Sequence, residues 1–464
     1  MTSRVIEHRI LLGVMILAVV WVAVYPAGVA AQNTQYPGDN AVYLSTTGTI
    51  TYSHGFVDAN QLGATDICAA INLALQQLVS STYTQYNGKG VIDARSVPVG
   101  SSSPCTATDS NPWGGTAPVT GWPYATVLLP AGIIEIGATW KLPEGTRIVG
   151  EGPNLTTLQA ISFSGTDMID MGGASPFCGN NDCNGVVIEH LGLNAGGQSV
   201  NGIVNQFSQE LSYVNDVSIT GIASTFTGLS IGSASAGQYA ANSGPYSAIY
   251  YSGSGTCVSI RGTYGTRGIH GLNCTGSNNP SGPAILLDGS NNSIENVSIS
   301  GYTGDGILVG SRASAQDNIL LNISSPTGSN LTNVIHVCGT GPGSSCNTSY
   351  VSDLTVMSAT SAANYTIADD VTGTKLPFST DQFVGLYVLG QPYPASSSIG
   401  NSRFSTSPTV PAWFVGSSQP SSACASSGSA SNGSIFSVTS QITGAGTTLW
   451  GCVGNTWRPL SGAY

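Results

Sequence analysis

Charged side chains are scarce in this chain. They make up 8% of its 464 residues, whereas an average soluble domain carries roughly 25%. Lys and Arg number only 12 against 23 Asp and Glu, which gives a formal net charge of −11. So few basic side chains argue against a partner that is nucleic acid or another polyanion held by charge.

Long hydrophobic runs are also missing, apart from one near the beginning. That run extends from Ile10 to Tyr25, behind the basic residues Arg4 and Arg9, and is followed by small residues ending at Ala31. This order is typical of a secretory signal peptide, so we expect residues 1–31 to be removed by cleavage after Ala31. An uncleaved membrane anchor is the alternative, because the run is slightly long. Either reading predicts a secreted or cell-surface protein.

The segment from residue 126 to 152 has no two-residue Asn-Gly or Asp-Gly turn to join neighbouring strands. It contains four very short apolar stretches, Thr126–Leu129, Ile133–Ile136, Thr139–Leu142 and Arg147–Val149, each followed by a Gly or Pro corner. Strands of three or four residues are too short for an ordinary sheet of hairpins. Their pairing partners must therefore lie elsewhere in the chain.

Cysteine and glycine are abundant. The 60 glycines supply the corners, and the 10 cysteines, an even number in a chain predicted to be exported, indicate disulfides. A zinc site is the rival reading, but no Cys-x2-Cys spacing occurs. Pairing of sequence neighbours predicts the disulfides Cys68–Cys105, Cys178–Cys183, Cys257–Cys274, Cys338–Cys346 and Cys424–Cys452.

An internal repeat follows. Two apolar residues flank one small residue in His190-Leu-Gly-Leu193, Asp216-Val-Ser-Ile219, Cys257-Val-Ser-Ile260, Asn296-Val-Ser-Ile299 and Asp353-Leu-Thr-Val356. A second motif follows four of them, at Asn201-Gly-Ile, Thr227-Gly-Leu, Arg267-Gly-Ile and Asp305-Gly-Ile. The first spacing is 26 residues in both columns, and we interpret the longer spacings as inserted loops.

A repeat of about 25 residues built from short strands predicts an all-β, right-handed, single-stranded parallel β-helix, in which each strand pairs with its equivalent one coil away. The amphipathic segment Thr65–Val79, with Thr65 or Asp66 as the candidate cap, predicts an α-helix that covers the N-terminal end. The residues expected to point inward are Val217, Ile219, Val258, Ile260, Val297, Ile299, Leu354 and Val356.

These signals divide the chain into five parts: a signal peptide (1–31), an N-terminal extension with the capping helix (32–125), the parallel β-helix (126–395), a Ser/Pro-rich linker (396–417) and a C-terminal β-hairpin module (418–464). We expect the last part to be a small module, stapled by the disulfide Cys424–Cys452.

The motifs Gly63-Ala-Thr-Asp66, Leu129-Pro-Ala-Gly132, Leu142-Pro-Glu-Gly and Ile148-Val-Gly-Glu-Gly152 resemble the start of the pectate lyase superfamily domain, also seen in rhamnogalacturonase-like and epimerase-like proteins. The resemblance covers roughly residues 55–390. It implies a parallel β-helix and a polysaccharide partner. The superfamily includes lyases, hydrolases, epimerases and tailspikes, so the resemblance leaves the activity open.

The candidate site follows from the Gly-Ile column. Gly304-Asp305-Gly306-Ile307 resembles half of the Asp-Asp element of polygalacturonases, with Gly306 in place of the second Asp, so the hydrolase pattern is incomplete. We predict that Arg267 holds a sugar carboxylate and that His270 transfers a proton. Asp305 is predicted to orient one of these two residues or to bind Ca²⁺. The predicted substrate-binding residues are Arg261, Asn201, Tyr250 and Tyr251. A surface salt bridge between Arg267 and Asp305 is the plain structural alternative.

Two function classes remain open. The first is a secreted polysaccharide lyase or glycoside hydrolase. The second is a non-catalytic extracellular solenoid for glycan binding, adhesion or cell-surface structure. No cofactor is expected, except that a lyase can use Ca²⁺ to neutralise a uronate. The expected partner is a polysaccharide, with no nucleic acid and with no membrane unless the N-terminal segment stays uncleaved. The oligomeric state is left open.

Overall fold

A computed structural model gives the fold of the chain. The residues it describes are 43–44, 50–51, 55–79, 90–105, 110–114, 124–172, 183–232, 240–310, 315–325, 331–337, 351–352, 355–361, 365–369, 382–388, 413–416, 435–438, 449–453 and 456–459. The predicted signal peptide lies outside them. No helix among these residues has the length and hydropathy needed to cross a bilayer.

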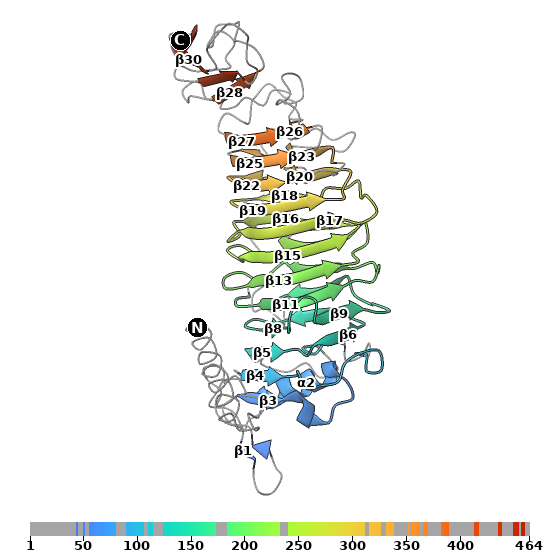
Figure 1. Ribbon diagram of the computed structural model, residues 1–464. Helices are drawn as coiled ribbons and strands as arrows, with labels where there is room; N and C mark the ends of the chain where they lie inside the picture. The colour runs from blue at the N-terminus through green and yellow to red at the C-terminus, as the bar shows by residue number, and fades with distance from the viewer. Residues whose placement is uncertain are drawn as a thin grey trace, which may run out of the picture. The chain divides into compact units, whose positions relative to one another are not determined.

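Two long sheets of parallel strands contain most of the described strands from residue 57 onward (Figure 1). The fourteen-stranded sheet contains β3 (Phe56–Asp58), β4 (Gly90–Asp93), β5 (Ala125–Leu128), β6 (Gly132–Ile136), β8 (Arg147–Val149), β9 (Thr156–Ala160), β11 (Val187–Asn194), β13 (Tyr213–Thr220), β15 (Tyr246–Gly253), β17 (Ile269–Gly276), β19 (Ser293–Ser300), β22 (Ile319–Ser324), β25 (Thr355–Ser361) and β27 (Gln382–Val388).

The nine-stranded sheet supplies the other side of each coil. It contains β7 (Trp140–Leu142), β10 (Asp167–Met171), β12 (Asn201–Asn205), β14 (Thr227–Gly232), β16 (Thr256–Tyr264), β18 (Ile285–Ser290), β20 (Asp305–Val309), β23 (Asn333–Val337) and β26 (Tyr365–Asp369). The chain alternates between the two sheets, so each strand pairs with the equivalent strand of the next coil. Val214, for example, pairs with Tyr246, 32 residues later.

The coil is right-handed. In Figure 1 the front strands run from left to right while the chain climbs from β5 to β27. A strand that leads through a crossover into a parallel neighbour takes this hand in nearly all proteins. The predicted fold, a right-handed parallel β-helix, is therefore confirmed, and the four short strands expected between residues 126 and 149 are β5 to β8.

A sharp corner divides each long strand of the fourteen-stranded sheet. One residue per coil has a positive φ between 51° and 67°, and these residues are in register from coil to coil. They are His190, Asp216, Ala248, Gly271, Asn296 and Asn322. We call the strand segments before and after this corner the first and second halves. β8 and β9 are the same two halves separated by a short loop, since both pair with β11.

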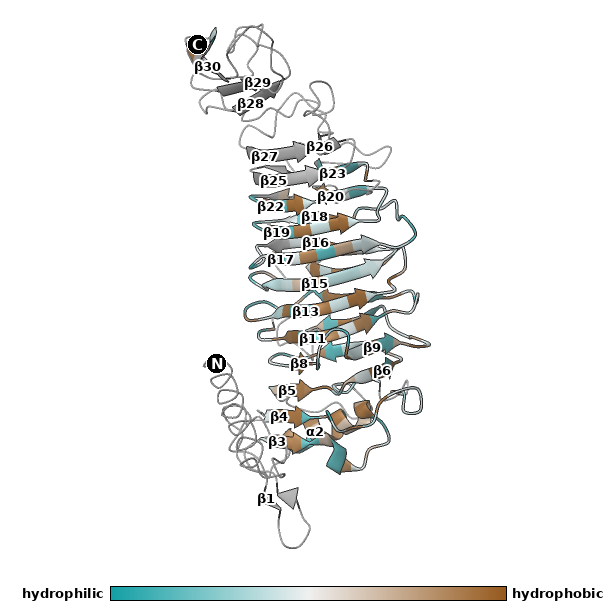
Figure 2. Ribbon diagram, in the orientation of Figure 1, coloured by the Kyte–Doolittle hydropathy of each residue, from teal (hydrophilic) through white to brown (hydrophobic). Residues whose placement is uncertain are grey.

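Aliphatic columns fill the interior of the coils. Six of the residues predicted to point inward are at most 1% exposed, namely Val217, Ile219, Val258, Ile260, Val297 and Ile299. Figure 2 shows hydrophobic and polar residues alternating along the front strands. Each buried Val or Ile stabilises the fold by about 1.5–3 kcal/mol as an upper estimate. Leu354 and the side chain of Val356 lie outside the described residues.

Helix α2 (Ile67–Val79) closes the N-terminal end, as predicted, next to β4 and the short 3-10 helix η1 (Ala59–Leu62) (Figure 1). Asp66 caps it, because its Oδ1 accepts a hydrogen bond of 2.9 Å from the Ala69 amide. The apolar side of the helix belongs to the same hydrophobic core as the coils.

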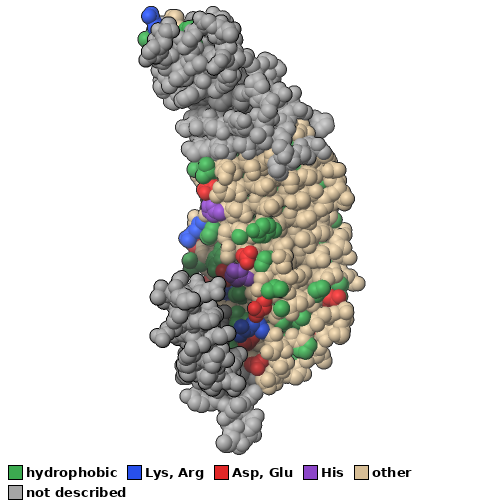
Figure 3. All heavy atoms as spheres, in the orientation of Figure 1, with side chains coloured by type: hydrophobic (Ala, Val, Ile, Leu, Met, Phe, Trp, Pro, Cys, Tyr) green, Lys and Arg blue, Asp and Glu red, His purple; other side chains and the backbone are tan. Residues whose placement is uncertain are grey.

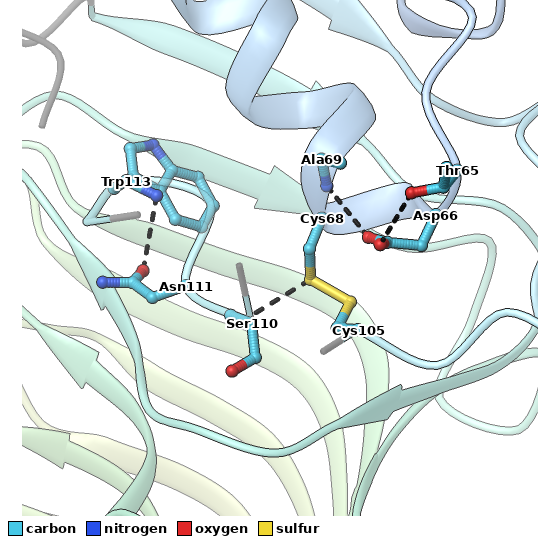
Figure 4. The surroundings of a disulfide bond; sticks show 8 residues. All are labelled: Thr65, Asp66, Cys68, Ala69, Cys105, Ser110, Asn111 and Trp113. Atoms are coloured by element: carbon cyan, nitrogen blue, oxygen red, sulfur yellow. Dashed lines mark hydrogen bonds between the residues drawn. A yellow bond between two sulfur atoms is a disulfide. The ribbon is translucent and has the colours of Figure 1, made fainter. Parts of the chain in front are cut away.

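Two of the predicted disulfides are confirmed, Cys68–Cys105 and Cys257–Cys274. The first joins α2 to the segment that leads into the coils (Figure 4). Cys183 is also disulfide-bonded. Each of the other three predicted pairs includes at least one cysteine that lies outside the described residues, namely Cys178, Cys338, Cys346 and Cys424.

The remaining strands form small sheets. β21 (Ala315–Gln316) pairs with β24 (Val351–Ser352). Near the N-terminus, β1 (Tyr43–Leu44) pairs with β2 (Ile50–Thr51). A C-terminal sheet contains β28 (Trp413–Gly416), β29 (Ile435–Val438), β30 (Leu449–Val453) and β31 (Thr456–Pro459).

Two predicted boundaries need correction. The predicted C-terminal hairpin is the antiparallel pair β29–β30, but its sheet begins earlier, with β28 inside the predicted linker. The β-helix also begins earlier than residue 126, because β3 and β4 already belong to the fourteen-stranded sheet. The three strands β3, β4 and β28 are only three or four residues long, which explains why periodicity in the sequence did not reveal them.

Candidate functional site

Polar and charged side chains form pairs between coils along the first halves of the fourteen-stranded sheet. Glu189, 6% exposed, accepts hydrogen bonds from Arg147 Nε at 2.7 Å and from the Tyr213 hydroxyl at 2.9 Å. At the corner, His190 Nδ1 lies 2.7 Å from Asp216 Oδ2. In Figure 3 the charged side chains gather along one edge of the visible face. Each of these groups has a partner, so the row stabilises the stack of coils.

Arg267 and His270 lie on this same part of the molecule. Arg267 lies two residues before the start of β17, and its amide donates a hydrogen bond to the Ser243 carbonyl. His270 is in the first half of β17, and its Nδ1 lies 3.4 Å from Glu295 Oε2 of the next coil. These two predicted catalytic residues are therefore close in the fold, and His270 already has a carboxylate beside it.

The third predicted catalytic residue is elsewhere. Asp305 begins β20 of the nine-stranded sheet, where its Oδ2 lies 2.7 Å from His336 Nδ1 and its Oδ1 accepts a hydrogen bond of 2.8 Å from Asn333. The predicted convergence of Asp305 with Arg267 and His270 is therefore wrong, since they belong to different sheets. Asp305 does orient a histidine, but that histidine is His336.

The error came from the repeat alignment. Cys257-Val-Ser-Ile260 belongs to β16 of the nine-stranded sheet, while the other described copies of that motif lie on the fourteen-stranded sheet. Arg267-Gly-Ile begins β17 of the fourteen-stranded sheet, whereas Asn201, Thr227 and Asp305 begin strands of the nine-stranded one. Both sheets carry the same apolar–small–apolar pattern, so composition alone did not separate them.

The predicted binding residues are also divided. Asn201 and Arg261 lie on the nine-stranded sheet, in β12 and β16. Tyr251 points into the core and is 3% exposed, so its side chain is not placed to bind a substrate as predicted. Its ring fills the space beside Gly228, where a Cβ would lie 2.5 Å from a ring carbon. Tyr250, by contrast, is 52% exposed.

Tyr250 stands within an uncharged surface made by the second halves of five long strands. In register with it are Ser218 on the coil before and Asn273 on the coil after. We call this surface the hydroxyl face. Its outward residues are Ser218, Thr220, Tyr250, Ser252, Asn273, Thr275, Ser298, Ser300 and Ser324, all of which are half-buried or exposed.

Several groups of the hydroxyl face have weak or no bonds within the described protein. Thr275 Oγ1 lies 3.4 Å from both Asn273 Oδ1 and Ser300 Oγ. Within the described ranges, Ser218, Ser298 and the Tyr250 hydroxyl form no side-chain hydrogen bond. These donors and acceptors are therefore available to a ligand on the surface.

A separate group of titratable side chains, which sequence reasoning missed, lies on the nine-stranded sheet. Asp167 and Asp170 are both in β10. Lys141 of β7 pairs in register with Asp170, and Asn201 of β12 pairs with Asp167. A signal was present, because Asp167-Met-Ile occupies the same place as Asp305-Gly-Ile. The search for glycine at the second position left it out.

The described residues offer one cluster with metal-ligand spacing, formed by Asp66, Cys68 and Cys105. Its two cysteines are joined in a disulfide, and Asp66 caps α2, so it does not fit a metal ion. The Ca²⁺ ion that a lyase would use therefore has no cluster of three close carboxylates or histidines within the described part of the chain.

No protein-family profile matches the chain, and no curated protein matches it. Solved structures that resemble it include a protein of Geobacillus virus E2, at 15% identity and a TM-score of 0.39, where the match covers 73% of this chain and 62% of that one. The chain thus spans 62% of the length of that viral protein.

Two other solved structures also resemble the chain. The A-module of a mannuronan C-5 epimerase from Azotobacter vinelandii has 13% identity and a TM-score of 0.38, with 72% of this chain and 95% of that one covered. A tailspike mutant of E. coli bacteriophage HK620, solved with a hexasaccharide, has 13% identity and a TM-score of 0.34. The match covers 76% of this chain and 62% of the tailspike chain. The assignment of the fold rests on the chain's own strand pairing.

Proposed function

We propose that this protein is an extracellular polysaccharide-binding β-helix that holds its ligand on the hydroxyl face. The single observation that carries this function is Tyr250, half exposed at the centre of a surface of hydroxyl and amide groups. An aromatic ring stacks on the apolar face of a sugar, while side-chain hydroxyls and amides bind its hydroxyl groups.

The ligand is a neutral polysaccharide rather than a polyuronate. The nine outward residues of the hydroxyl face include no Lys or Arg, and Arg267, which was expected to hold a carboxylate, lies in front of the first half of β17. An acidic glycan would find no opposite charge on this face, and the chain as a whole is negative. Disulfides among the described cysteines fit an oxidising, extracellular location.

Binding is tested by titrating the purified protein with neutral polysaccharides and polyuronates. We expect Tyr250→Ala to weaken binding of a neutral polysaccharide by about two- to twelvefold, because one stacked ring contributes roughly 0.5–1.5 kcal/mol. Tyr124→Ala is the matched control, since Tyr124 is also a partly exposed tyrosine, 42% exposed, outside the hydroxyl face. Equal loss in both variants, or stronger binding of the polyuronate, would contradict the proposal.

Beyond binding, we propose that the protein cleaves its polysaccharide, either by hydrolysis or by elimination. The same polysaccharides are assayed for new reducing ends and for unsaturated ends by ultraviolet absorbance. Reducing ends alone indicate hydrolysis, and unsaturated ends indicate elimination. Binding without either product would make the protein a non-catalytic solenoid.

A further inference from the structure

The hydroxyl face is long in one direction and narrow in the other. Its outward residues form two columns that lie two positions apart on each strand. The register continues the first column from β13 to β22 and the second from β13 to β19. Paired strands are about 4.8 Å apart, and a two-residue step along a strand covers about 7 Å. The face is therefore roughly 19 Å long parallel to the axis of the solenoid and only about 7 Å wide.

The two columns differ in whether their polar groups already have partners. In the second column, the Thr220 hydroxyl donates a hydrogen bond of 3.2 Å to the Leu193 carbonyl, and Ser252 Oγ lies 3.3 Å from Ser277 Oγ. In the first column, four successive coils present polar groups with at most one weak side-chain bond within the described ranges. These four residues, which we call the free row, are Ser218, Tyr250, Asn273 and Ser298.

The chain itself marks both ends of the free row. Before the row, Gly192 occupies the same column on β11, and a Cβ on this residue would lie 2.5 Å from the Pro153 carbonyl oxygen. The backbone at Pro153 therefore covers the column on that coil. After the row, Ser324 continues the column on β22, but its hydroxyl donates a hydrogen bond of 2.9 Å to the Val297 carbonyl. The free row is thus limited to four positions.

Polar positions that repeat at the strand spacing suit a ligand that repeats at the same distance. In a β-1,4-linked glucan, mannan or xylan both bonds that join each sugar to its neighbours are equatorial. Such a chain is extended, and each sugar lengthens it by nearly the spacing of paired strands. An α-1,4-linked chain of glucose coils instead, so its hydroxyl groups leave a straight row after one or two sugars. An extended chain laid along one strand would meet only the two positions across the width of the face.

We propose that the ligand is an extended β-1,4-linked neutral polysaccharide that lies parallel to the axis of the solenoid, with one sugar on each position of the free row. This rests on the proposed function, because the face is the same, and it adds the linkage and the direction of the glycan. The Tyr250 ring stacks on one sugar. The hydroxyl and amide groups at the other three positions bind hydroxyl groups of the neighbouring sugars.

Linkage and length are tested by calorimetric titration of the full chain with oligosaccharides of two to six sugars. Cello-, manno- and xylo-oligosaccharides carry the β-1,4 linkage. Malto-oligosaccharides are the matched control, because they contain the glucose of the cello series in α-1,4 linkage. For at least one β-1,4 series, affinity should rise at least about tenfold from two to four sugars and then change by less than about twofold. The four-sugar malto ligand should bind at least about tenfold more weakly than the best β-1,4 ligand of that length.

The direction of the glycan is tested with two double variants on the same two strands. Ser218→Ala/Ser298→Ala removes both ends of the free row and should weaken binding of the four-sugar ligand at least about fivefold. Thr220→Ala/Ser300→Ala is the matched control, because it removes two hydroxyls of the second column on β13 and β19. It should change the same affinity by less than about twofold. Thermal unfolding verifies that both variants keep the fold of the wild-type protein.

Four outcomes would overturn the linkage and direction: equal affinity for α-1,4 and β-1,4 ligands, no dependence on length, a greater loss in the control pair than in the free-row pair, or binding of a neutral polysaccharide without binding of any β-1,4 series. In each of these cases the protein still binds a neutral glycan, so the proposed function is not contradicted. Failure to bind any neutral glycan would instead contradict the proposed function, and the linkage with it.

Discussion

Asp170 shows how one side chain can act against the stability of its own fold. Burial, together with the neighbouring Asp167 carboxylate, raises the pKa of the Asp170 carboxyl from its ordinary value of 3.8 to about 7 in the folded chain. At any pH between these two pKa values, Asp170 therefore carries a proton in the folded state but not in the unfolded state. Stability is greatest below the unfolded value, falls as the pH rises toward 7 and stays constant above it.

This leads to a prediction for Asp170→Asn. The substitution removes the charge without changing the shape, so the variant should be more stable than the wild-type protein at about pH 8, by roughly 2–4 kcal/mol, and about equally stable near pH 4. Denaturant unfolding at the two pH values measures both differences. If the variant and the wild-type protein differed in unfolding free energy by the same amount at pH 4 and at pH 8, ionisation of the Asp170 carboxyl would not be what destabilises the wild-type fold.

At the level of single residues, sequence reasoning succeeded where a pattern was local and failed where two sheets share one pattern. Thr65 or Asp66 was expected to cap the helix, and Asp66 does so. Asp305 was expected to orient Arg267 or His270 or to bind Ca²⁺, and in the structure it pairs with His336 instead. Which histidine lies one coil away depends on inserted loop lengths, and a sequence repeat does not reveal them.

At the level of elements, the short strands and the capping helix could be predicted because apolar residues recur in each with the period of that structure. The strands alternate along two faces, and α2 places an apolar residue at every third or fourth position. What the sequence did not reveal was the corner that splits each long strand. His190, Asp216 and Ala248 share a positive φ but no side-chain chemistry, so no common residue marks that position.

The capping helix allows a test within one element. Leu75 is fully buried against the first coil, whereas Leu73 of the same helix is 39% exposed. Leu75→Ala should lower the free energy of unfolding by about 2–5 kcal/mol, because it removes packed methyl groups and leaves a cavity. Leu73→Ala should change it by less than about 0.5 kcal/mol. Thermal or denaturant unfolding measures both, and similar losses would mean that α2 does not close the end of the core.

At the scale of the whole molecule, the two confirmed disulfides restrain the chain over different distances. Cys68–Cys105 spans 37 residues and ties the cap to the coils, whereas Cys257–Cys274 spans 17 residues between the two sheets. Loop closure predicts about 4 kcal/mol of stabilisation for the first and about 3 kcal/mol for the second.

Replacing each pair by serines tests this difference. The Cys68→Ser/Cys105→Ser variant should unfold at a lower denaturant concentration than Cys257→Ser/Cys274→Ser, measured without reductant. Under reducing conditions the two variants and the wild-type protein should converge. The reverse order would show that packing around the cysteines outweighs the length of chain that each bond closes.

The pairing of each strand with only the coil before and the coil after also has a mechanical consequence. Successive strands of the fourteen-stranded sheet are separated by 23 residues from Tyr246 to Ile269 and by 32 from Val214 to Tyr246. A pull along the chain therefore loads one coil while its neighbours stay intact. Each coil that unfolds adds about 80–110 Å to the extended length of the chain. Under force the solenoid should therefore unfold one coil at a time and dissipate mechanical energy at each step.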